Sequence, residues 1–327
     1  MTDPDEPTDL SPMDDTASSS PAGSPAGDPA PTRYELDPAD RRTKLRENVI
    51  EAINALPFHF ASPINIEGLD AGDLFQLNTL LGGAIEVQTV DTLNRIRSVW
   101  DPDDEWQDYG FKRFSQSFPD VRLVRGDNTQ QPILGIELKG WYLLSKEAEP
   151  SFRYQATAEA SSVWDLLVCV PWTLSNVLSG SPRILEPYVE QAKYAADMRT
   201  YYWKHLRAGD AGSRNSDIHV PQGVTPYAPA GTSTSDKPAQ DGGGNFGRVA
   251  RIRGLMSSWI SGLVNSPVSG IPAKYWIDFL KAFSESNDQE QLRRKITALV
   301  RRADTSAEEA KAERVYELLS ELRQTLN

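Results

Sequence analysis

Apolar residues in the middle of the chain recur at two different periods. Residues 73–97 (DLFQLNTLLGGAIEVQTVDTLNRIR) place Leu, Ile and Val near the spacing of one helix face, with Gly82 and Gly83 as a point of bending or interruption. Short apolar runs after residue 110 have the composition of strands: FKRFSQSF, DVRLV, ILGIELK, WYLLS and DLLVCVPW. Residues 187–207 open with Pro187 and close before a glycine, so they predict another helix. This mixture of helices and strands predicts an α/β sandwich.

The C-terminal part has a purely helical pattern. Residues 273–326 predict three helices, in the segments AKYWIDFLKAFSE, QEQLRRKITALVRRA and SAEEAKAERVYELLSELRQTL. Ser306 and Glu309 have the spacing of a capping box at the start of the last one. Short helices of this kind cover an edge of a core or mediate dimerisation.

Two low-complexity stretches divide the chain. The first 30 or so residues are rich in Pro, Ser, Asp, Gly and Ala and have few large apolar side chains, so they predict a disordered tail. A second stretch begins near residue 208. The expected organisation has four parts: an acidic tail (1–33), an α/β core (34–207), a flexible linker or long loop (208–244), and a basic segment with C-terminal helices (245–327).

The charge is concentrated at one end. The formal net charge is −12. Residues 1–40 hold ten Asp and Glu residues against one arginine, a net charge of −9 that leaves −3 for the rest of the chain. The nearly balanced body is therefore compatible with a nucleic-acid partner, in spite of the overall acidity.

Several classes of protein are excluded by missing signals. The single cysteine, Cys169, excludes an internal disulfide framework and lies in an apolar run that predicts a core position. The three histidines are widely scattered, and the P-loop, HExxH and GxSxG motifs are absent. The chain has neither a run of about 18 apolar residues nor a signal-peptide pattern, so we expect a cytoplasmic protein with no membrane partner.

Residues 117–141 (SFPDVRLVRGDNTQQPILGIELKGW) have the pattern of a hairpin. If residues 126–131 (GDNTQQ) form a symmetric turn, residue i faces residue 257 − i on the partner strand. Asp120 then faces Glu137, and the apolar residues between them and the turn face each other on the opposite side of the sheet: Val121 with Ile136, and Leu123 with Leu134. Lys139 lies on the same face as Glu137, because side chains alternate with a period of two.

Two opposed carboxylates with Cβ atoms roughly 5 Å apart destabilise a sheet unless a cation lies between them. Mg²⁺ binds one or two carboxylates and leaves its other positions to water and phosphate oxygens. Lys139 would hold the phosphate and the attacking water, or help to activate that water. The cluster therefore fits phosphodiester hydrolysis.

At these positions the chain resembles the PD-(D/E)XK nuclease superfamily, to which most type II restriction endonucleases and many repair nucleases belong. Pro119 and Asp120 match the PD element, and Glu137 and Lys139 match the E-x-K element. The resemblance covers about residues 45–207. It implies a restriction-endonuclease-like α/β/α sandwich with a mixed central sheet, followed here by C-terminal helices.

The resemblance implies a metal-dependent DNA endonuclease of type II restriction or phage defence. Asp120 and Glu137 would bind Mg²⁺, with Mn²⁺ as a substitute, and the products would carry 5′-phosphate and 3′-hydroxyl ends. The expected partners are double-stranded DNA, a second copy of the chain in a homodimer, and defence-system proteins. Two alternatives stay open: a repair or recombination nuclease that acts on ends, and a non-catalytic nucleic-acid-binding subunit with the same fold.

Further candidates follow from the same resemblance and from charge. Glu86 matches a glutamate that family members often carry on the helix before the strands, near the metal or its water; the alternative is an exposed helix carboxylate. Gln191 and Tyr194 resemble a Gln and Tyr pair that contacts DNA, at a spacing of three instead of four. The arginines of NFGRVARIRG are candidate phosphate contacts or solvated surface charges: Arg248, Arg251 and Arg253.

Overall fold

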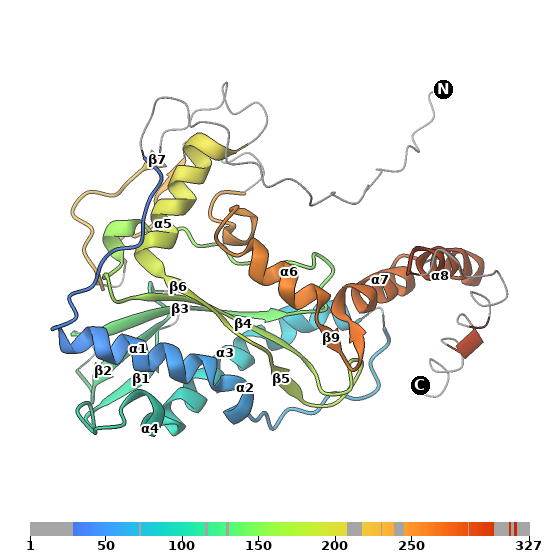
Figure 1. The fold of residues 1–327 in the computed structure, drawn as a ribbon, viewed down its shortest axis with the longest axis horizontal. Coiled ribbons are helices and arrows are strands. Elements are labelled where there is room, and N and C mark those ends of the chain that lie inside the picture. Colours follow the sequence, from blue (N-terminus) through green and yellow to red (C-terminus); the bar gives the residue numbers. More distant parts are fainter. Residues whose placement is uncertain are drawn as a thin grey trace.

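A mixed six-stranded sheet organises the part of the chain that the computed structural model describes. The described residues are 29–71, 73–114, 117–128, 131–207, 218–229, 231–238, 245–286, 288–303 and positions 314, 317 and 318. Helices lie on both sides of the sheet, with α1 to α4 on one side and α5 and α6 on the other (Figure 1). The structure is therefore of the mixed α/β class, as the sequence predicts.

The sheet combines an antiparallel meander with one parallel pairing. β1, β2 and β3 pair antiparallel in chain order, β4 runs parallel to β3, and β5 and β6 both pair antiparallel with β4. The strands are β1 (Tyr109–Arg113), β2 (Val121–Arg125), β3 (Leu134–Tyr142), β4 (Leu166–Leu174), β5 (Pro182–Ile184) and β6 (Tyr188–Gln191). Two short ribbons lie outside this sheet: β7 (Ile218–His219) with β8 (Lys237–Pro238), and β9 (Pro267–Val268) with β10 (Ile271–Pro272).

The helices vary widely in length. The α-helices are α1 (Arg41–Asn54), α2 (Leu56–His59), α3 (Leu77–Arg95), α4 (Arg97–Trp100), α5 (Ala192–Tyr201), α6 (Ser257–Asn265), α7 (Ala273–Ser284) and α8 (Gln289–Ala303). Single 3₁₀ turns are η1 (Leu74–Gln76), η2 (Ala158–Ala160) and η5 (Val249–Arg251), and α5 continues into a π-helical turn, η3 (Tyr202–Leu206).

The core between the sheet and the first helices is apolar on both sides. Val121 and Ile136 from the hairpin meet Ile53 of α1 and Val90 and Leu93 of α3. All five side chains are at most 4% exposed. Burial of each such side chain stabilises the fold by about 1.5–3 kcal/mol. This contact places the face that carries Val121 and Ile136 against α1 and α3. The side chains at alternate positions, Glu137 and Lys139 among them, leave β3 on the opposite face.

The helix predicted at residues 73–97 is confirmed as η1 and α3, and it is continuous through Gly82 and Gly83. Gly82 packs closely on β3, because a Cβ atom at Gly140 would lie 3.3 Å from the Gly82 carbonyl oxygen. The strand predicted at WYLLS is not separate, since β3 extends from Leu134 to Tyr142.

The helix predicted at residues 187–207 begins later than expected. Tyr188–Gln191 form strand β6, and the helix starts at Ala192. The register pairs Leu166 with Gln191 and Cys169 with Tyr188. Backbone hydrogen bonds to a strand about 20 residues away outweigh the local helix signal of Pro187, and such a long-range pairing leaves no local sequence pattern.

Two of the three predicted C-terminal helices are confirmed as α7 and α8, whereas α6 was not predicted. The expected capping box at Ser306 and Glu309 lies outside the described residues, as does most of the expected tail. Arg33, expected in that tail, forms a two-pronged ion pair with Glu190 at 2.7 and 3.0 Å. Cys169 is fully buried, as expected.

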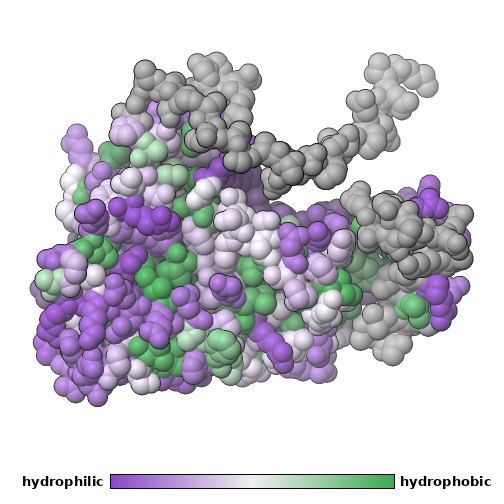
Figure 2. Space-filling model, viewed as in Figure 1, coloured by the Kyte–Doolittle hydropathy of each residue, from purple (hydrophilic) through white to green (hydrophobic). Residues whose placement is uncertain are grey.

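The exposed surface carries scattered apolar residues. On the face shown in Figure 2, hydrophobic patches lie between hydrophilic regions. The large exposed apolar side chains include Phe58 of α2 and Leu80 of α3. Within the described ranges, no helix has the length and apolar character needed to cross a membrane.

Candidate active site

The predicted hairpin register is confirmed. Val121 pairs with Ile136, and Leu123 pairs with Leu134. The pairing ends at Val121 and Ile136 on the side away from the turn. The next two residues in register, Asp120 and Glu137, therefore lie at the open end of the hairpin. The backbone amide of Asp120 donates a hydrogen bond to Oε2 of Glu137 at 3.3 Å. The Asp120 charge also raises the pKa of Glu137, so the two carboxylates lie near each other.

Gly135 lets Pro119 and Asp120, which we call the PD corner, pack closely against β3. A Cβ atom at Gly135 would overlap Cγ of Pro119 and lie 3.1 Å from Oδ1 of Asp165. The buried Asp165 carboxylate accepts hydrogen bonds from the amides of Gly135 (2.7 Å) and Ser162 (2.8 Å) and from the Tyr227 hydroxyl (2.5 Å). Burial raises the pKa of Asp165 to about 6, and its three donors act against this shift. Asp165 thus has a structural role, holding the base of the hairpin.

Glu86 of α3 binds two cations beside the open end of the hairpin. Its Oε1 accepts hydrogen bonds from Lys139 Nζ and from the Gly140 amide, each at 3.2 Å. Its Oε2 accepts a hydrogen bond from Arg113 Nη2 at 3.2 Å. The Glu86 side chain is 12% exposed, against 31% for Lys139. We call these residues the carboxylate cluster: Glu86, Arg113, Asp120, Glu137 and Lys139.

Burial and mutual repulsion oppose ionisation of the two acids at the open end. Burial raises the pKa of Asp120 to about 6, and the charge of Glu86 adds to this effect. Burial also raises the pKa of Glu137 well above its usual value, and the Asp120 charge raises it further. The nearby Lys139 lowers both pKa values only in part. A metal cation bound between Asp120 and Glu137, in addition to Lys139, would therefore stabilise their ionised forms.

The donor set fits one Mg²⁺ ion held by two carboxylates. Among the described residues, no group of three or more His, Cys, Asp and Glu side chains is arranged to hold a metal. Mg²⁺ does not require three, because it keeps several waters and binds one or two carboxylates together with phosphate oxygens. Asp120 and Glu137 supply these two donors, and Mn²⁺ accepts the same oxygen ligands. Glu86, expected near the metal or its water, lies close enough for its charge to raise the pKa of Asp120 and Glu137, and it also holds Lys139 and Arg113.

Gln191 and Tyr194 make packing contacts instead of forming a pair on one helix. Gln191 ends β6, and its side-chain amide bonds the backbone of Tyr34 (2.8 Å) and of Val163 (2.8 Å). Tyr194 is buried in α5, with the Arg33 guanidinium 4.9 Å from its ring centroid. The expected pair is not on one helix, since Gln191 belongs to the strand that precedes α5.

The predicted arginine group divides into two parts. Arg248 and Arg251 both reach the Glu149 carboxylate, at 3.7 and 2.7 Å. Arg253 is exposed and lies outside this contact. Among the hydrogen bonds and ion pairs of the described residues, none joins these arginines to Asp120 or Glu137.

Two residues near the acids were missed in the sequence. Arg113 ends β1 and pairs in register with Val121, so it lies beside Asp120. Tyr154 is fully buried; its hydroxyl is 2.9 Å from Ser161 Oγ, and burial and the Glu137 charge raise its pKa. The only sequence sign that Arg113 belongs to the site is its position as a basic residue in the first strand. The segment around Tyr154 carries no motif.

The carboxylate cluster combines two carboxylates that could hold a divalent cation with a lysine on the same face of β3. Comparisons with family models, with curated proteins and with solved structures give no match for this chain. The function proposed below is therefore based on the geometry of these side chains.

Proposed function

We propose that this chain is a metal-dependent DNA endonuclease of type II restriction or phage defence, built on a restriction-endonuclease-like α/β/α sandwich. The observation that supports it most is the open end of the β2 and β3 hairpin. There Asp120 and Glu137 share one space, and Lys139 follows Glu137 on the same face. The antiparallel meander followed by the parallel strand β4 is the scaffold on which this cluster is built.

We assign each member of the cluster a role that its contacts support. Asp120 and Glu137 hold Mg²⁺, which when bound polarises the phosphoryl oxygen, lowers the pKa of a water and neutralises developing charge. Lys139 donates hydrogen bonds to the phosphate and to the attacking water. Glu86 orients Lys139 through the 3.2 Å contact and is a positioning residue. Arg113 adds a second positive charge that attracts the substrate phosphate.

The proposed substrate is double-stranded DNA, and the proposed products carry 5′-phosphate and 3′-hydroxyl ends. Cleavage of both strands at one site requires two carboxylate clusters or two successive reactions. A homodimer would supply two clusters related by a twofold axis. Recognition of a DNA sequence would come from side chains that reach the base edges, in addition to those that bind phosphates.

The test is a cleavage assay on three DNA forms. Supercoiled plasmid, the same plasmid after linearisation, and unmethylated phage DNA are incubated with the full chain in Mg²⁺, in Mn²⁺ and in EDTA. Discrete fragments that need metal and are lost in Lys139→Ala support the proposal. Degradation of linear DNA alone would favour the repair nuclease, and a mobility shift without cleavage would favour the non-catalytic subunit.

A further inference from the structure

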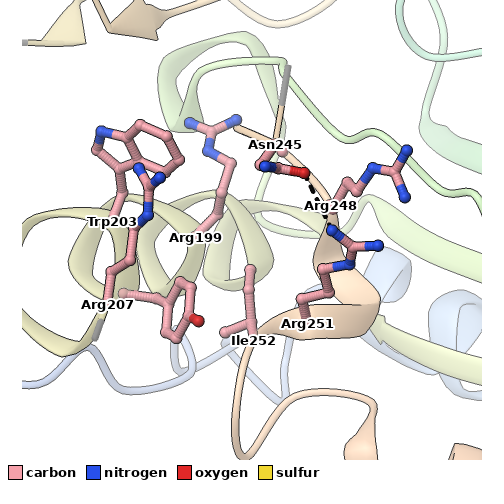
Figure 3. A pocket seen from close by; sticks show the side chains of 9 residues that line it. Arg199, Trp203, Arg207, Asn245, Arg248, Arg251 and Ile252 are labelled. Atoms are coloured by element: carbon pink, nitrogen blue, oxygen red, sulfur yellow. Dashed lines mark hydrogen bonds between the residues drawn. The ribbon is translucent and has the colours of Figure 1, made fainter. Parts of the chain in front are cut away.

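A cavity of about 240 Å³ lies between the end of α5 and the loop that leads to η5. Figure 3 shows arginines on two sides of it, with Arg199 and Arg207 on one side and Arg248 and Arg251 on the other. We call it the arginine cavity. The other side chains and backbone that line it are Tyr202, Trp203, Asn245, Gly247 and Ile252.

Gly247 determines where the second pair of arginines lies. Its φ is +84°, and a Cβ atom there would lie 2.8 Å from the carbonyl oxygen of Tyr154. This close approach lets the Gly247 carbonyl accept a hydrogen bond from the Tyr154 amide at 2.8 Å, and Val249 then donates to the Phe152 carbonyl at 3.2 Å. The loop is thus paired with a core segment, which holds Arg248 at the cavity.

Arg199 is a buried charge that keeps one donor unused. Its side chain is 2% exposed and forms an ion pair with Asp236 at 2.5 Å. Its Nη1 donates to the carbonyls of Tyr154 (3.1 Å) and Ala156 (2.8 Å). Its Nε is buried without a hydrogen-bond partner, and so is Nε of Arg248. An unsatisfied buried donor costs about 1–3 kcal/mol, and an acceptor that reached either Nε atom would remove that cost.

Among the described residues, the arginines that line the cavity outnumber the carboxylates that form ion pairs with them. Arg248 and Arg251 share the carboxylate of Glu149. Arg207 stacks on Trp203, with its Cζ atom 3.9 Å from the ring centroid, and within the described chain it has no carboxylate at ion-pair distance. Among the described residues, these four guanidinium groups form ion pairs with two carboxylates, Glu149 and Asp236, and the charge of Asp197 also acts on Arg199. Guanidinium groups stay protonated and match the oxygens of a phosphate group.

We propose that the arginine cavity binds the phosphate group of a nucleotide. Its volume is small compared with pockets for drug-sized ligands, which suits one phosphate and a part of the group that carries it. The lining of the cavity has no residue in common with the carboxylate cluster, although Tyr154 lies near both: Arg199 bonds its carbonyl, and the charge of Glu137 acts on its hydroxyl. This inference goes beyond the proposed function, because phosphate binding here does not require cleavage.

The test is calorimetric titration of the full chain in EDTA, which prevents metal-dependent cleavage. The probes are inorganic phosphate, adenosine 5′-monophosphate, and one short single-stranded oligonucleotide with either a 5′-phosphate or a 5′-hydroxyl. The variants are Arg207→Gln and Arg248→Gln, which leave the buried pair of Arg199 and Asp236 intact. The matched control is Arg253→Gln, an exposed arginine of the same segment that does not line the cavity.

We expect at least one phosphate probe to bind, with a loss of affinity of tenfold or more in Arg207→Gln and Arg248→Gln and no change in Arg253→Gln. Binding of the mononucleotide would identify a free nucleotide as the ligand. Binding of the oligonucleotide alone would identify a strand, and dependence on its 5′-phosphate would place a strand end in the cavity. Absence of binding by every probe, or equal affinity in all variants, would overturn the proposal. Because cleavage is not measured, a failed nuclease assay leaves this result standing.

Discussion

The backbone amide of Asp120 lies 3.3 Å from Oε2 of Glu137, at the point where β2 and β3 separate. The Glu137 carboxylate thus lies beside the backbone of Asp120, both side chains are largely buried, and both pKa values are raised. Ionising two buried carboxyl groups close to each other lowers the free energy of unfolding. A bound cation would recover that cost.

Replacement of Asp120 by asparagine is expected to stabilise the metal-free protein at neutral pH. The folded-state pKa is about 6, above the ordinary value near 4, so the folded chain keeps a proton that the unfolded chain has lost. Stability therefore falls as pH rises between these two values, and asparagine removes this loss. In EDTA at pH 7 we expect a gain on the order of 2 kcal/mol in the free energy of unfolding.

Denaturant titration at pH 7 and pH 4 measures this gain, with Asp127→Asn as a control. Asp127 is fully exposed in an ion pair with Lys112, so its replacement should change stability little. The advantage of Asp120→Asn should shrink at pH 4, where the folded carboxyl is largely protonated and the unfolded one is about half protonated. An Asp120→Asn protein that is less stable than wild type at pH 7 would contradict the account of this pair.

Replacement of Glu86 by glutamine is expected to reduce cleavage while leaving metal affinity nearly unchanged. Glutamine keeps an acceptor for the Gly140 amide but loses the charge that holds Lys139 and Arg113. We expect the cleavage rate to fall by about 10-fold to 100-fold, the range found when a group that orients a functional residue is removed. Mn²⁺ titration of the variant separates the roles: a loss of affinity as large as in Asp120→Asn would make Glu86 a metal ligand instead.

Replacement of Gly135 by alanine is expected to destabilise the protein and to impair cleavage. The new methyl group would overlap Pro119 and press on the Asp165 carboxylate, so the PD corner would have to move away from β3. Overpacking of this kind costs about 1–3 kcal/mol. Thermal unfolding of Gly135→Ala and of Gly83→Ala checks this. Gly83 lies in α3 with nothing within 4 Å of an added Cβ atom, and alanine there should stabilise the helix by about 1 kcal/mol. Equal stability of Gly135→Ala and wild type would show that the corner tolerates the shift.

The hairpin could be predicted because its information is local. The period of two and the polar turn fixed the pairing of Val121 with Ile136, and from it the position of Asp120 opposite Glu137. Glu86 could be named from the helix pattern, but its partners could not. Its bonds to Lys139 and Arg113 depend on how α3 crosses the edge of β3, which no local spacing records.

Strand β6 and the arginine cavity could not be predicted from the sequence, because both depend on contacts between distant segments of the chain. The local pattern predicts a helix from residue 187, and it does not show strand β6, because the partner strand β4 is about 20 residues away in the chain. The arginine cavity lies between α5 and a loop more than 40 residues later. Arg153 is bridged to Arg248 of that loop, and Arg199 of α5 bonds the carbonyl of the neighbouring Tyr154. No local sequence pattern indicates that Arg199 and Arg207 lie across a cavity from Arg248.

Plasmid cleavage by matched variants tests the catalytic assignment most directly. Single-turnover rates on supercoiled plasmid in Mg²⁺ are compared for wild type, Glu137→Gln, Lys139→Ala and Lys146→Ala. Lys146 is the control, since it forms a surface ion pair with Glu285 at 2.7 Å. We predict that wild type and Lys146→Ala cleave at equal rates, whereas Glu137→Gln and Lys139→Ala are slower by about 100-fold or more. Cleavage by all four proteins at one rate, or by none of them, would contradict the assignment of Glu137 and Lys139 as the catalytic pair.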